Sequence, residues 1–435
     1  MFERVLLIDS GMKNLGGHNF TYTRAVQAAF EQRGYMVTVF TNKQLPDEVV
    51  NATGYRPVFT YGAYDFPQGR SRVVRLLRLY QQARVYRQEL ESALAPACAD
   101  HYSLIFCHTV NDFELIAWSD YVSRHPLAGH LMILLRHTHG FRSCHPLKLS
   151  WHPYWRIKPH YLNALYTRLG GRFTLLTDSE LLTEDFASMY RHRIVTVPIP
   201  VSEQLLNAHA EGDRSSASLH VRENVNRAGG LCIGYMGDAR GAKGFHLMPG
   251  LVRQVLAETD EGIRFVIQCP PSASGANNGQ PAEETVQLEQ LQQVAHAAPT
   301  RVTLIAERLT ERDYAQLFHH LDIVVLPYLA DYYAHGTASI FAEALALAKP
   351  VVVPAGTWMA RELAKSGGGE TFQSGNVVDL TAKVLQVIRR YEHYATKAQS
   401  FSAAWRAFHN PHTLVDLLLQ ESQAATNERR HGCIS

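Results

Sequence analysis

Short apolar runs alternate with amphipathic segments along the whole chain. The runs cover residues 5–8, 36–40, 104–107, 131–135, 173–176 and 194–197, and later 231–236, 263–267, 302–305, 324–326 and 351–353. Mainly apolar runs of this length are typical of strands buried on both faces of a parallel sheet. Because helical patterns fill most of the intervals, we expect an α/β protein built from βαβ units.

The pattern fades between Ser202 and about Gly229, where Ser, Ala, Asn, Glu and Arg dominate. A chain of 435 residues is long enough for two domains, and this stretch lies near its middle. We therefore predict an N-terminal domain over residues 1–205, a linker over 206–229 and a C-terminal domain over 230–400. Residues 401–435 are expected to form a terminal helix that packs back across the domains, followed by a tail.

Composition narrows the class of protein. Hydrophobic residues make up 46% and charged residues 19%, which is typical of a globular chain with an ample core. The net charge of +2 does not favour nucleic-acid binding. The six cysteines show no Cys-x-x-Cys spacing, and neither a signal peptide nor a membrane-spanning run is recognisable. These features favour a cytoplasmic protein with reduced thiols.

The most informative stretch runs from Val324 to Val352. A buried strand is followed by the small residues Gly336 to Ser339, and a helix is expected from about Thr337. Free amides at a helix start bind anions, and Glu343 lies less than two turns further along. A diphosphate at the helix start and a ribose on Glu343 would form a nucleotide site. A plain βαβ unit with a solvated glutamate remains an alternative.

Two other strands end in polar loops that contain glycine. The loop after residues 5–8 contains Gly16 and Gly17, but it does not have the spacing of a dinucleotide site, and a tight turn is an alternative. The loop after residues 231–236 contains Gly237, Arg240 and Lys243. Its two cations suit a diphosphate, since Arg offers paired donors and Lys a point charge.

Histidines follow two predicted strands of the N-terminal half. His108 comes directly after residues 104–107, while Arg136, His137 and His139 come directly after residues 131–135. A histidine past the carboxyl end of a parallel strand usually faces the ligand cleft, where it can donate to a sugar hydroxyl or move a proton. A structural role remains open for each of them.

Two segments are candidates for an interaction surface. Residues 70–87 form a basic helix that interleaves six arginines with apolar side chains, a pattern that suits an anionic membrane or a phosphorylated acceptor. Further on, Trp151 and Trp155 lie among basic residues, which suits an interfacial or acceptor-facing surface. An ordinary surface helix and a loop packed on its own domain are the alternatives.

The chain resembles the retaining, GT-B type nucleotide-sugar glycosyltransferases (glycosyl transferases group 1, family 4-like). Two stretches carry the resemblance, GDARGAKGF from Gly237 and HGTASIFAEALALAKPVVVP from His335. The early Gly-Gly loop and the mid-chain linker also fall in the family order. The resemblance implies two Rossmann-like domains that face a central cleft, with a C-terminal helix crossing back to the N-terminal domain.

The resemblance also implies roles for individual residues. The loop cations would bind the donor diphosphate, the helix start would bind phosphate, and Glu343 would hold the ribose. The predicted catalytic residues are His137, His139, Arg240 and Lys243; the predicted donor-binding residues are Gly16, Gly17, Gly237, Arg240, Lys243, His335, Gly336, Thr337, Ala338, Ser339 and Glu343; the predicted acceptor-binding residues are His108, Arg136, Trp151 and Trp155.

The sequence departs from the family pattern at two positions. His335 stands where the family usually has a first glutamate, and Asp238 stands where it usually has the loop arginine, so Arg240 is taken as a substitute. No Asp-x-Asp triplet occurs, so the expected cofactor is none, and protein cations would hold the diphosphate.

The implied function is retaining transfer of a sugar from a nucleotide-diphosphate donor to a glycan or lipid-linked acceptor. We expect such a reaction to serve bacterial surface polysaccharide or glycoconjugate synthesis, in the cytoplasm or at the inner face of the membrane. Two alternatives stay open: a nucleotide-sugar epimerase on the same fold, and a non-catalytic binding subunit, which His335 favours.

Overall fold

The chain divides into two compact units, and the first is formed by Met1–Pro200 together with Asn410–Ser435. The structure is a computed structural model that describes residues 3–14, 18–94, 101–136, 154–208, 230–259, 262–270 and 283–432. The elements of the first unit are β1 (Arg4–Asp9), α1 (His18–Glu31), β2 (Met36–Asn42), α2 (Asp47–Thr53), β3 (Arg56–Phe59), α3 (Arg72–Ala93), β4 (Leu104–Cys107), α5 (Asp112–Arg124), β5 (His130–Leu135), α6 (Tyr154–Leu169), η1 (Gly170–Arg172), β6 (Phe173–Thr177), α7 (Glu180–Ala187), β7 (Ile194–Thr196) and α18 (Pro411–Gly432).

The second unit is formed by Val201–His409. Its elements are α8 (Glu203–Asn207), β8 (Leu231–Tyr235), η3 (Gly241–Lys243), η4 (Phe245–Leu247), α10 (Met248–Glu258), β9 (Ile263–Gln268), α11 (Glu283–Ala297), β10 (Val302–Ile305), α12 (Glu311–His320), β11 (Ile323–Val325), α13 (Ala330–Tyr333), α14 (Ser339–Ala346), β12 (Val351–Pro354), α15 (Trp358–Ser366), β13 (Gly369–Phe372), α16 (Val377–Arg389) and α17 (Tyr391–Phe408). The second unit therefore begins at Val201, earlier than the predicted boundary. It also includes the whole of α17, and so extends past residue 400, where the C-terminal domain was predicted to end.

Each unit is built around one parallel sheet. The strand order is β3-β2-β1-β4-β5-β6-β7 in the first unit and β10-β9-β8-β11-β12-β13 in the second. In both sheets the order reverses beside the first strand, between β1 and β4 and between β8 and β11. Open α/β sheets bind ligands outside the carboxyl ends of the strands at such a reversal. Each sheet therefore has one position at which a ligand site is expected.

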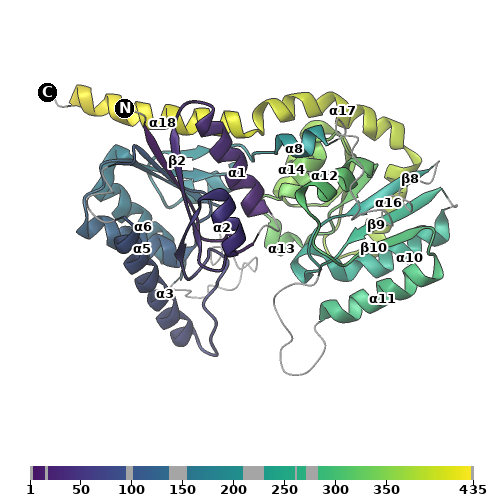
Figure 1. The fold of residues 1–435 in the computed structure, drawn as a ribbon. Coiled ribbons are helices and arrows are strands. Elements are labelled where there is room, and N and C mark those ends of the chain that lie inside the picture. The colour runs from purple at the N-terminus through teal and green to yellow at the C-terminus, as the bar shows by residue number, and fades with distance from the viewer. Residues whose placement is uncertain are drawn as a thin grey trace. The chain divides into compact units, whose positions relative to one another are not determined.

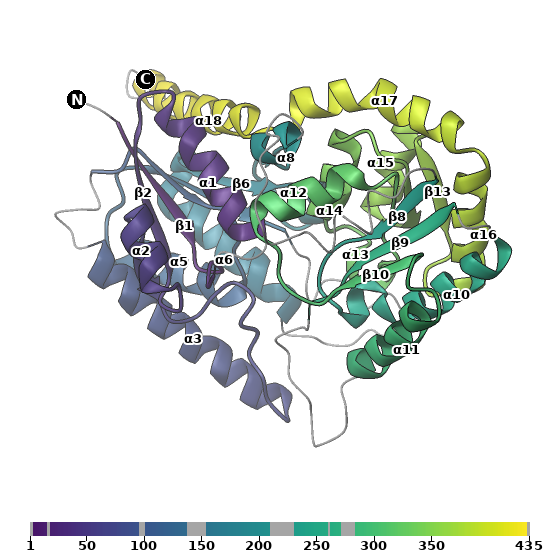
Figure 2. The ribbon, with the colours of Figure 1, turned by 45° about the vertical axis from the view of Figure 1, so that its right-hand side comes forward.

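Apolar strand residues alternate between two cores in the first unit. Leu6 and Ile8 face the core that contains α3 and α5, while Val5 and Leu7 face the core that contains α1 and α18. Because both faces of the central strands are covered, β1, β4 and β5 contain unbroken apolar runs in the sequence. In Figures 1 and 2 the yellow helix α18 runs beside α1, so the terminal helix packs on the first unit as predicted.

Two short strands have no counterpart in the sequence prediction. β3 is an edge strand that contains Pro57, which an edge tolerates because one side needs no ladder hydrogen bond. β13 is the other sheet's edge strand, and its polar residue Glu370 accepts a hydrogen bond from Gln386 Nε2 at 2.8 Å.

Candidate functional site

Two loops meet beyond the carboxyl ends of β8 and β11, where the strand order of the second sheet reverses. The loop after β8 contains η3, and the loop after β11 contains α13 and leads into α14. The amide of Leu329 donates to the carbonyl of Ala242 at 3.0 Å, which ties one loop to the other. The loops that carry the predicted donor residues thus form one surface.

Gly244 allows this close approach. Its φ of +68° lies in the left-handed region, and a Cβ atom there would lie 1.7 Å from the carbonyl oxygen of Pro327. Any larger residue would push the two loops apart, so glycine is required at position 244.

Lys243 projects from η3 toward the start of α14. A Cβ atom at Gly237 would lie 2.6 Å from Nζ of Lys243 and 3.1 Å from Cδ1 of Ile340, so the amine lies against the glycine backbone beside the first turn of the helix. Burial lowers the pKa of Lys243 to about 8, and the positive charge of Arg240 acts in the same direction. An anion bound here would relieve both effects.

The start of α14 offers free donors beside this amine. The helix begins at Ser339, two residues later than predicted, because Ala338 is its N-cap. Alanine has no side-chain acceptor, so no side chain caps the helix at this position. Among the described residues the amides of Ser339 and Ile340 have no partner. Lys243 and this helix start together place a cation beside two backbone donors, an arrangement that suits an anion.

Glu343 lies further along the same helix and is half-buried. Its Oε2 accepts a hydrogen bond of 2.6 Å from the hydroxyl of Tyr314. Burial raises the pKa of Glu343 to about 7, while the Tyr314 hydrogen bond and the charge of Lys243 lower it. Glu343, the residue predicted to bind the ribose, therefore lies close to Lys243, and its pKa lies near neutral pH.

Asp238 pairs with two arginines at the edge of the same loop. Its carboxylate lies 3.6 Å from Nε of Arg240 and 4.0 Å from Nη2 of Arg308. Both arginines are about half exposed, so these pairs are worth little as stabilising contacts. Asp238 thus lies close to two cations, Arg240 and Arg308. Arg308 was not predicted from the sequence.

The other predicted donor residues lie on the loop before α14. His335, Gly336 and Thr337 are half-buried, and Ala338 is buried. His335 and Thr337 already interact with other groups of the protein. Their contacts with a donor remain predictions.

In the first unit, four neighbouring strands place polar side chains at the carboxyl edge of the sheet. Asp9 ends β1, His108 follows β4, Arg136 follows β5 and Asp178 follows β6. Each of these residues is at most 7% exposed. The sequence predicted the histidine and the arginine, whereas Asp9 and Asp178 were missed because each reads as an ordinary residue at a strand end.

His108 is held on both ring nitrogens. Nε2 lies 2.9 Å from Oδ2 of Asp9 and 3.0 Å from the hydroxyl of Thr23, and Nδ1 lies 3.0 Å from the hydroxyl of Thr109. The ring of Tyr22 stacks on the imidazole at 4.5 Å. These contacts give His108 a structural role, and its predicted contact with an acceptor remains a prediction.

Arg136 lies above the Tyr22 ring, with Cζ 4.5 Å from the ring centroid, and its Nε is 3.5 Å from Oδ2 of Asp178. Its Nε and Nη2 are buried, and no hydrogen-bond partner reaches them from the described residues. Burial raises the pKa of Tyr22 to about 12, so the phenol stays protonated under the arginine.

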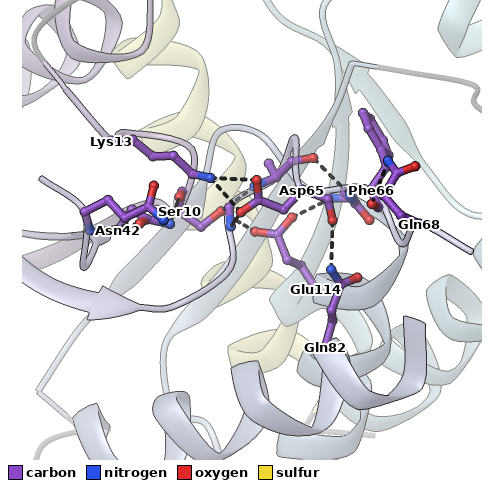
Figure 3. Close-up of polar contacts among 12 residues, drawn as sticks. Ser10, Lys13, Asn42, Asp65, Phe66, Gln68, Gln82 and Glu114 are labelled. Atoms are coloured by element: carbon purple, nitrogen blue, oxygen red, sulfur yellow. Dashed lines mark hydrogen bonds and ion pairs between the residues drawn. The ribbon is translucent and has the colours of Figure 1, made fainter. Parts of the chain in front are cut away.

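A second polar cluster ties the loops after β1 and β3 to the start of α5 in the same unit (Figure 3). The hydroxyl of Ser10 donates to Oε1 of Glu114 at 2.5 Å and accepts from the amide of Ala63 at 3.1 Å. Nζ of Lys13 lies 2.6 Å from Oδ1 of Asp65. Burial raises the pKa of Glu114 to about 8. The cluster connects these segments at the carboxyl edge of the sheet. It was not predicted from the sequence.

Several predicted site residues lie outside the described residues. Gly16, Gly17, His137, His139 and Trp151 fall in ranges that the structure does not describe, and so does the side chain of Trp155. The proposed catalytic histidines therefore remain sequence predictions.

Part of the second unit matches a known protein family. Residues 230–390 match the family described as Glycosyl transferases group 1. No curated protein matches the chain.

Solved structures resemble the chain over its full length. Sucrose-phosphate synthase from Thermosynechococcus elongatus is 13% identical, with 100% of both chains covered and a TM-score of 0.62. HepE from Anabaena, in complex with UDP and glucose, is 16% identical, with 97% of this chain and 100% of that chain covered and a TM-score of 0.60. An alpha,alpha-trehalose-phosphate synthase (UDP-forming) from Burkholderia vietnamiensis is 12% identical, with the same coverage and a TM-score of 0.63.

At such identities the structural likeness establishes the fold, and the family match rests on the second unit. That unit contains the candidate anion site of Lys243 and α14 together with Glu343. The chain thus has the two-domain GT-B fold, and its residues 230–390 match the family described as Glycosyl transferases group 1.

Proposed function

We propose that the protein is a retaining glycosyltransferase that moves a sugar from a nucleoside-diphosphate donor to a hydroxyl of a glycan or a lipid-linked acceptor. The observation that carries the proposal is the meeting of Lys243, the uncapped start of α14 and Glu343 at the strand-order reversal of the second sheet. A cation, two free amides and a carboxylate at one place match the diphosphate and the ribose of a nucleotide sugar.

The solved relatives support this class of donor. HepE was crystallised with UDP and with UDP-glucose. In the protein described here, Lys243, Arg240 and the α14 amides would hold the diphosphate, and Glu343 would hold the ribose. We propose no metal in this site, since the cations of the chain itself supply the positive charge.

The reaction breaks the bond between the anomeric carbon and the diphosphate oxygen. The acceptor hydroxyl attacks from the same face, a new carbon–oxygen bond forms with retained configuration, and the hydroxyl proton passes to the leaving phosphate. Negative charge grows on the diphosphate during this step, and Lys243, Arg240 and the helix dipole stabilise it in place. The transfer therefore needs no pair of catalytic carboxylates.

A nucleotide screen tests the proposal. We expect one of UDP, GDP, ADP, TDP and CMP to raise the melting temperature of the purified protein. At 100 times its Kd, such a ligand raises the free energy of unfolding by roughly 2.7 kcal/mol. Calorimetry then measures the affinity, and release of nucleoside diphosphate from the matching nucleotide sugar in the presence of an acceptor measures transfer. If none of the five changes the melting temperature, the proposed donor site is wrong.

Two other outcomes separate the alternatives. Binding of nucleotide without release in the presence of acceptor sugars would indicate a non-catalytic binding subunit, the role that His335 favours. Conversion of the nucleotide sugar into an epimer without an acceptor would indicate an epimerase.

We also propose that α3 contacts an anionic membrane surface. No helix in the described ranges is long and apolar enough to span a membrane. However, Val73 and Leu77 are 66% and 65% exposed, and Tyr80 is 44% exposed on the same helical stripe. The helix buries a separate stripe instead, through Leu79, Ala83, Tyr86 and Leu90.

The charge around this exposed stripe suits anionic lipid headgroups. Arg70, Arg72, Arg75 and Arg78 are all exposed beside it. An arginine close to an anionic membrane contributes about 1 kcal/mol to binding, and exposed apolar residues insert at the headgroup level.

A flotation experiment measures this contact. We expect the wild-type protein to float with vesicles of 30% phosphatidylserine, and the triple variant Arg72→Gln/Arg75→Gln/Arg78→Gln to partition about 100-fold less, from three arginines at about 1 kcal/mol each. The control is Arg4→Gln/Arg56→Gln/Arg124→Gln, which removes the same charge from exposed positions of the same unit. Equal flotation of the two triple variants, or none by the wild type, would end the proposal.

A further inference from the structure

Tyr314 occupies one oxygen of the only carboxylate that we place on the donor ribose. The residue lies in α12, 29 positions before Glu343, and its hydroxyl donates to Oε2 at 2.6 Å. In the described part of the chain no donor reaches Oε1 of Glu343. The carboxylate thus has one oxygen fixed by the protein and one that is free.

The position of Tyr314 is itself fixed by packing. Its ring lies edge to face with Phe318 in the same helix, at 5.7 Å between ring centroids. Burial and the nearby charge of Glu343 raise the pKa of Tyr314 well above its usual value, so the phenol keeps its proton and can only donate to the carboxylate. The direction of this hydrogen bond is therefore settled.

We propose that Tyr314 is a positioning residue for donor recognition: its hydroxyl holds Oε2 of Glu343, so that Oε1 is presented to a hydroxyl of the donor ribose. This inference rests on the proposed function, in which Glu343 binds the ribose. A carboxylate held by one oxygen loses less conformational entropy when the other oxygen binds a ligand, because its rotamer is already fixed.

The hydrogen bond also favours the charged form of Glu343. Three groups face this carboxylate: Tyr314 from α12, Lys243 from η3 and Tyr328 from the loop after β11. Burial raises the pKa of Glu343, whereas the Tyr314 hydroxyl and the Lys243 amine lower it. Removing the hydroxyl therefore leaves a larger fraction of Glu343 protonated at neutral pH, and a protonated carboxyl accepts a ribose hydroxyl less well.

The variant Tyr314→Phe tests the inference, because it removes one oxygen and keeps the ring contact with Phe318. The measurements are the Kd of the nucleoside diphosphate found in the screen and of its 2′-deoxy and 3′-deoxy analogues at one pH near 7.5, and the Kd of the intact nucleotide sugar between pH 5.5 and 8.5. We expect the variant to bind the ribonucleotide about tenfold more weakly and the deoxy analogue that has lost the recognised hydroxyl almost unchanged. The pH at which affinity is lost on the acid side should also move upward.

Two further variants make the result specific. Tyr394→Phe removes a tyrosine hydroxyl from Glu370, a like pair in α17 and β13, and should leave both the discrimination and the pH profile unchanged. Tyr314→Gln keeps a hydrogen-bond donor and should retain more ribose discrimination than Tyr314→Phe. If Tyr314→Phe does not fold, Tyr314→Leu takes its place as the variant without a donor. In the Glu343→Gln background, Tyr314→Phe should have little further effect.

The outcomes of the inference and of the proposed function differ. If the wild type binds a nucleoside diphosphate but Tyr314→Phe keeps the same ribose discrimination and the same acid limb, Tyr314 has no positioning role. If the wild type binds no nucleoside diphosphate, the proposed function itself is wrong.

Discussion

Replacing Lys243 with methionine is expected to lower kcat about 10²–10³-fold, the cost of removing one fixed donor from a developing negative charge. The amine lies against Gly237 and the start of α14, where the leaving diphosphate would be held. Its absence also weakens binding of the nucleoside diphosphate by about tenfold or more, because a charge-assisted hydrogen bond is lost. Single-turnover kinetics and calorimetry measure the two effects separately.

The same variant should become more stable in the absence of nucleotide. The pKa of Lys243 is about 8 in the folded protein against 10.5 for the ordinary side chain, so the folded state binds the proton less tightly than the unfolded state. The charged amine therefore opposes folding at pH 7, and this cost fades as the pH rises from 8 toward 10.5.

A melting curve at pH 7 is the matching measurement for stability. Arg253→Ala, which removes an exposed charge from α10, is the control and should change neither kcat nor the melting temperature. A methionine variant with kcat within threefold of the wild type would remove Lys243 from the mechanism.

Donor affinity is expected to follow a bell-shaped pH profile with its maximum between about pH 7 and pH 8. Below pH 7, Glu343 takes up a proton and affinity for the donor falls by up to tenfold per pH unit. Above pH 8, Lys243 loses its proton and affinity falls again. The limits are set by burial, which raises the pKa of the carboxylate and lowers that of the amine.

The intact nucleotide sugar is the ligand for this experiment. A free nucleoside diphosphate gains a proton near pH 6, which would distort the acid limb, whereas both phosphates of the sugar donor stay singly charged. Glu343→Gln should abolish the acid limb and leave the alkaline limb in place, and Lys243→Met should do the reverse. A flat profile for the wild type would contradict the assignment of both groups.

The parallel strands were predictable because their environment leaves a simple trace in the sequence. A strand covered on both faces reads as an unbroken apolar run, and this trace located β1, β4 and β5 in the first sheet and β11 and β12 in the second. Edge strands β3 and β13 are short and partly polar, so nothing in their sequence distinguishes them from loops.

The candidate site was predictable only where its residues are neighbours in the chain. Gly237, Lys243, the small residues before α14 and Glu343 fall in two continuous stretches, and the glycine loop and the helix start carry a recognisable pattern. Tyr314 and Arg308 come from other elements, so their sequence neighbourhoods give no signal.

By itself, the sequence determined the α/β class and the loops that bear the candidate donor residues, because hydrophobic periodicity and backbone-permissive glycines are local properties. Only the tertiary structure decided which side chains share an environment. It placed Lys243 beside Ile340, set the hydroxyl of Tyr314 on Glu343, and buried both ionisable groups enough to bring their pKa values toward neutrality. Burial and long-range contacts are made when strands from distant parts of the chain pair, and no local pattern encodes them.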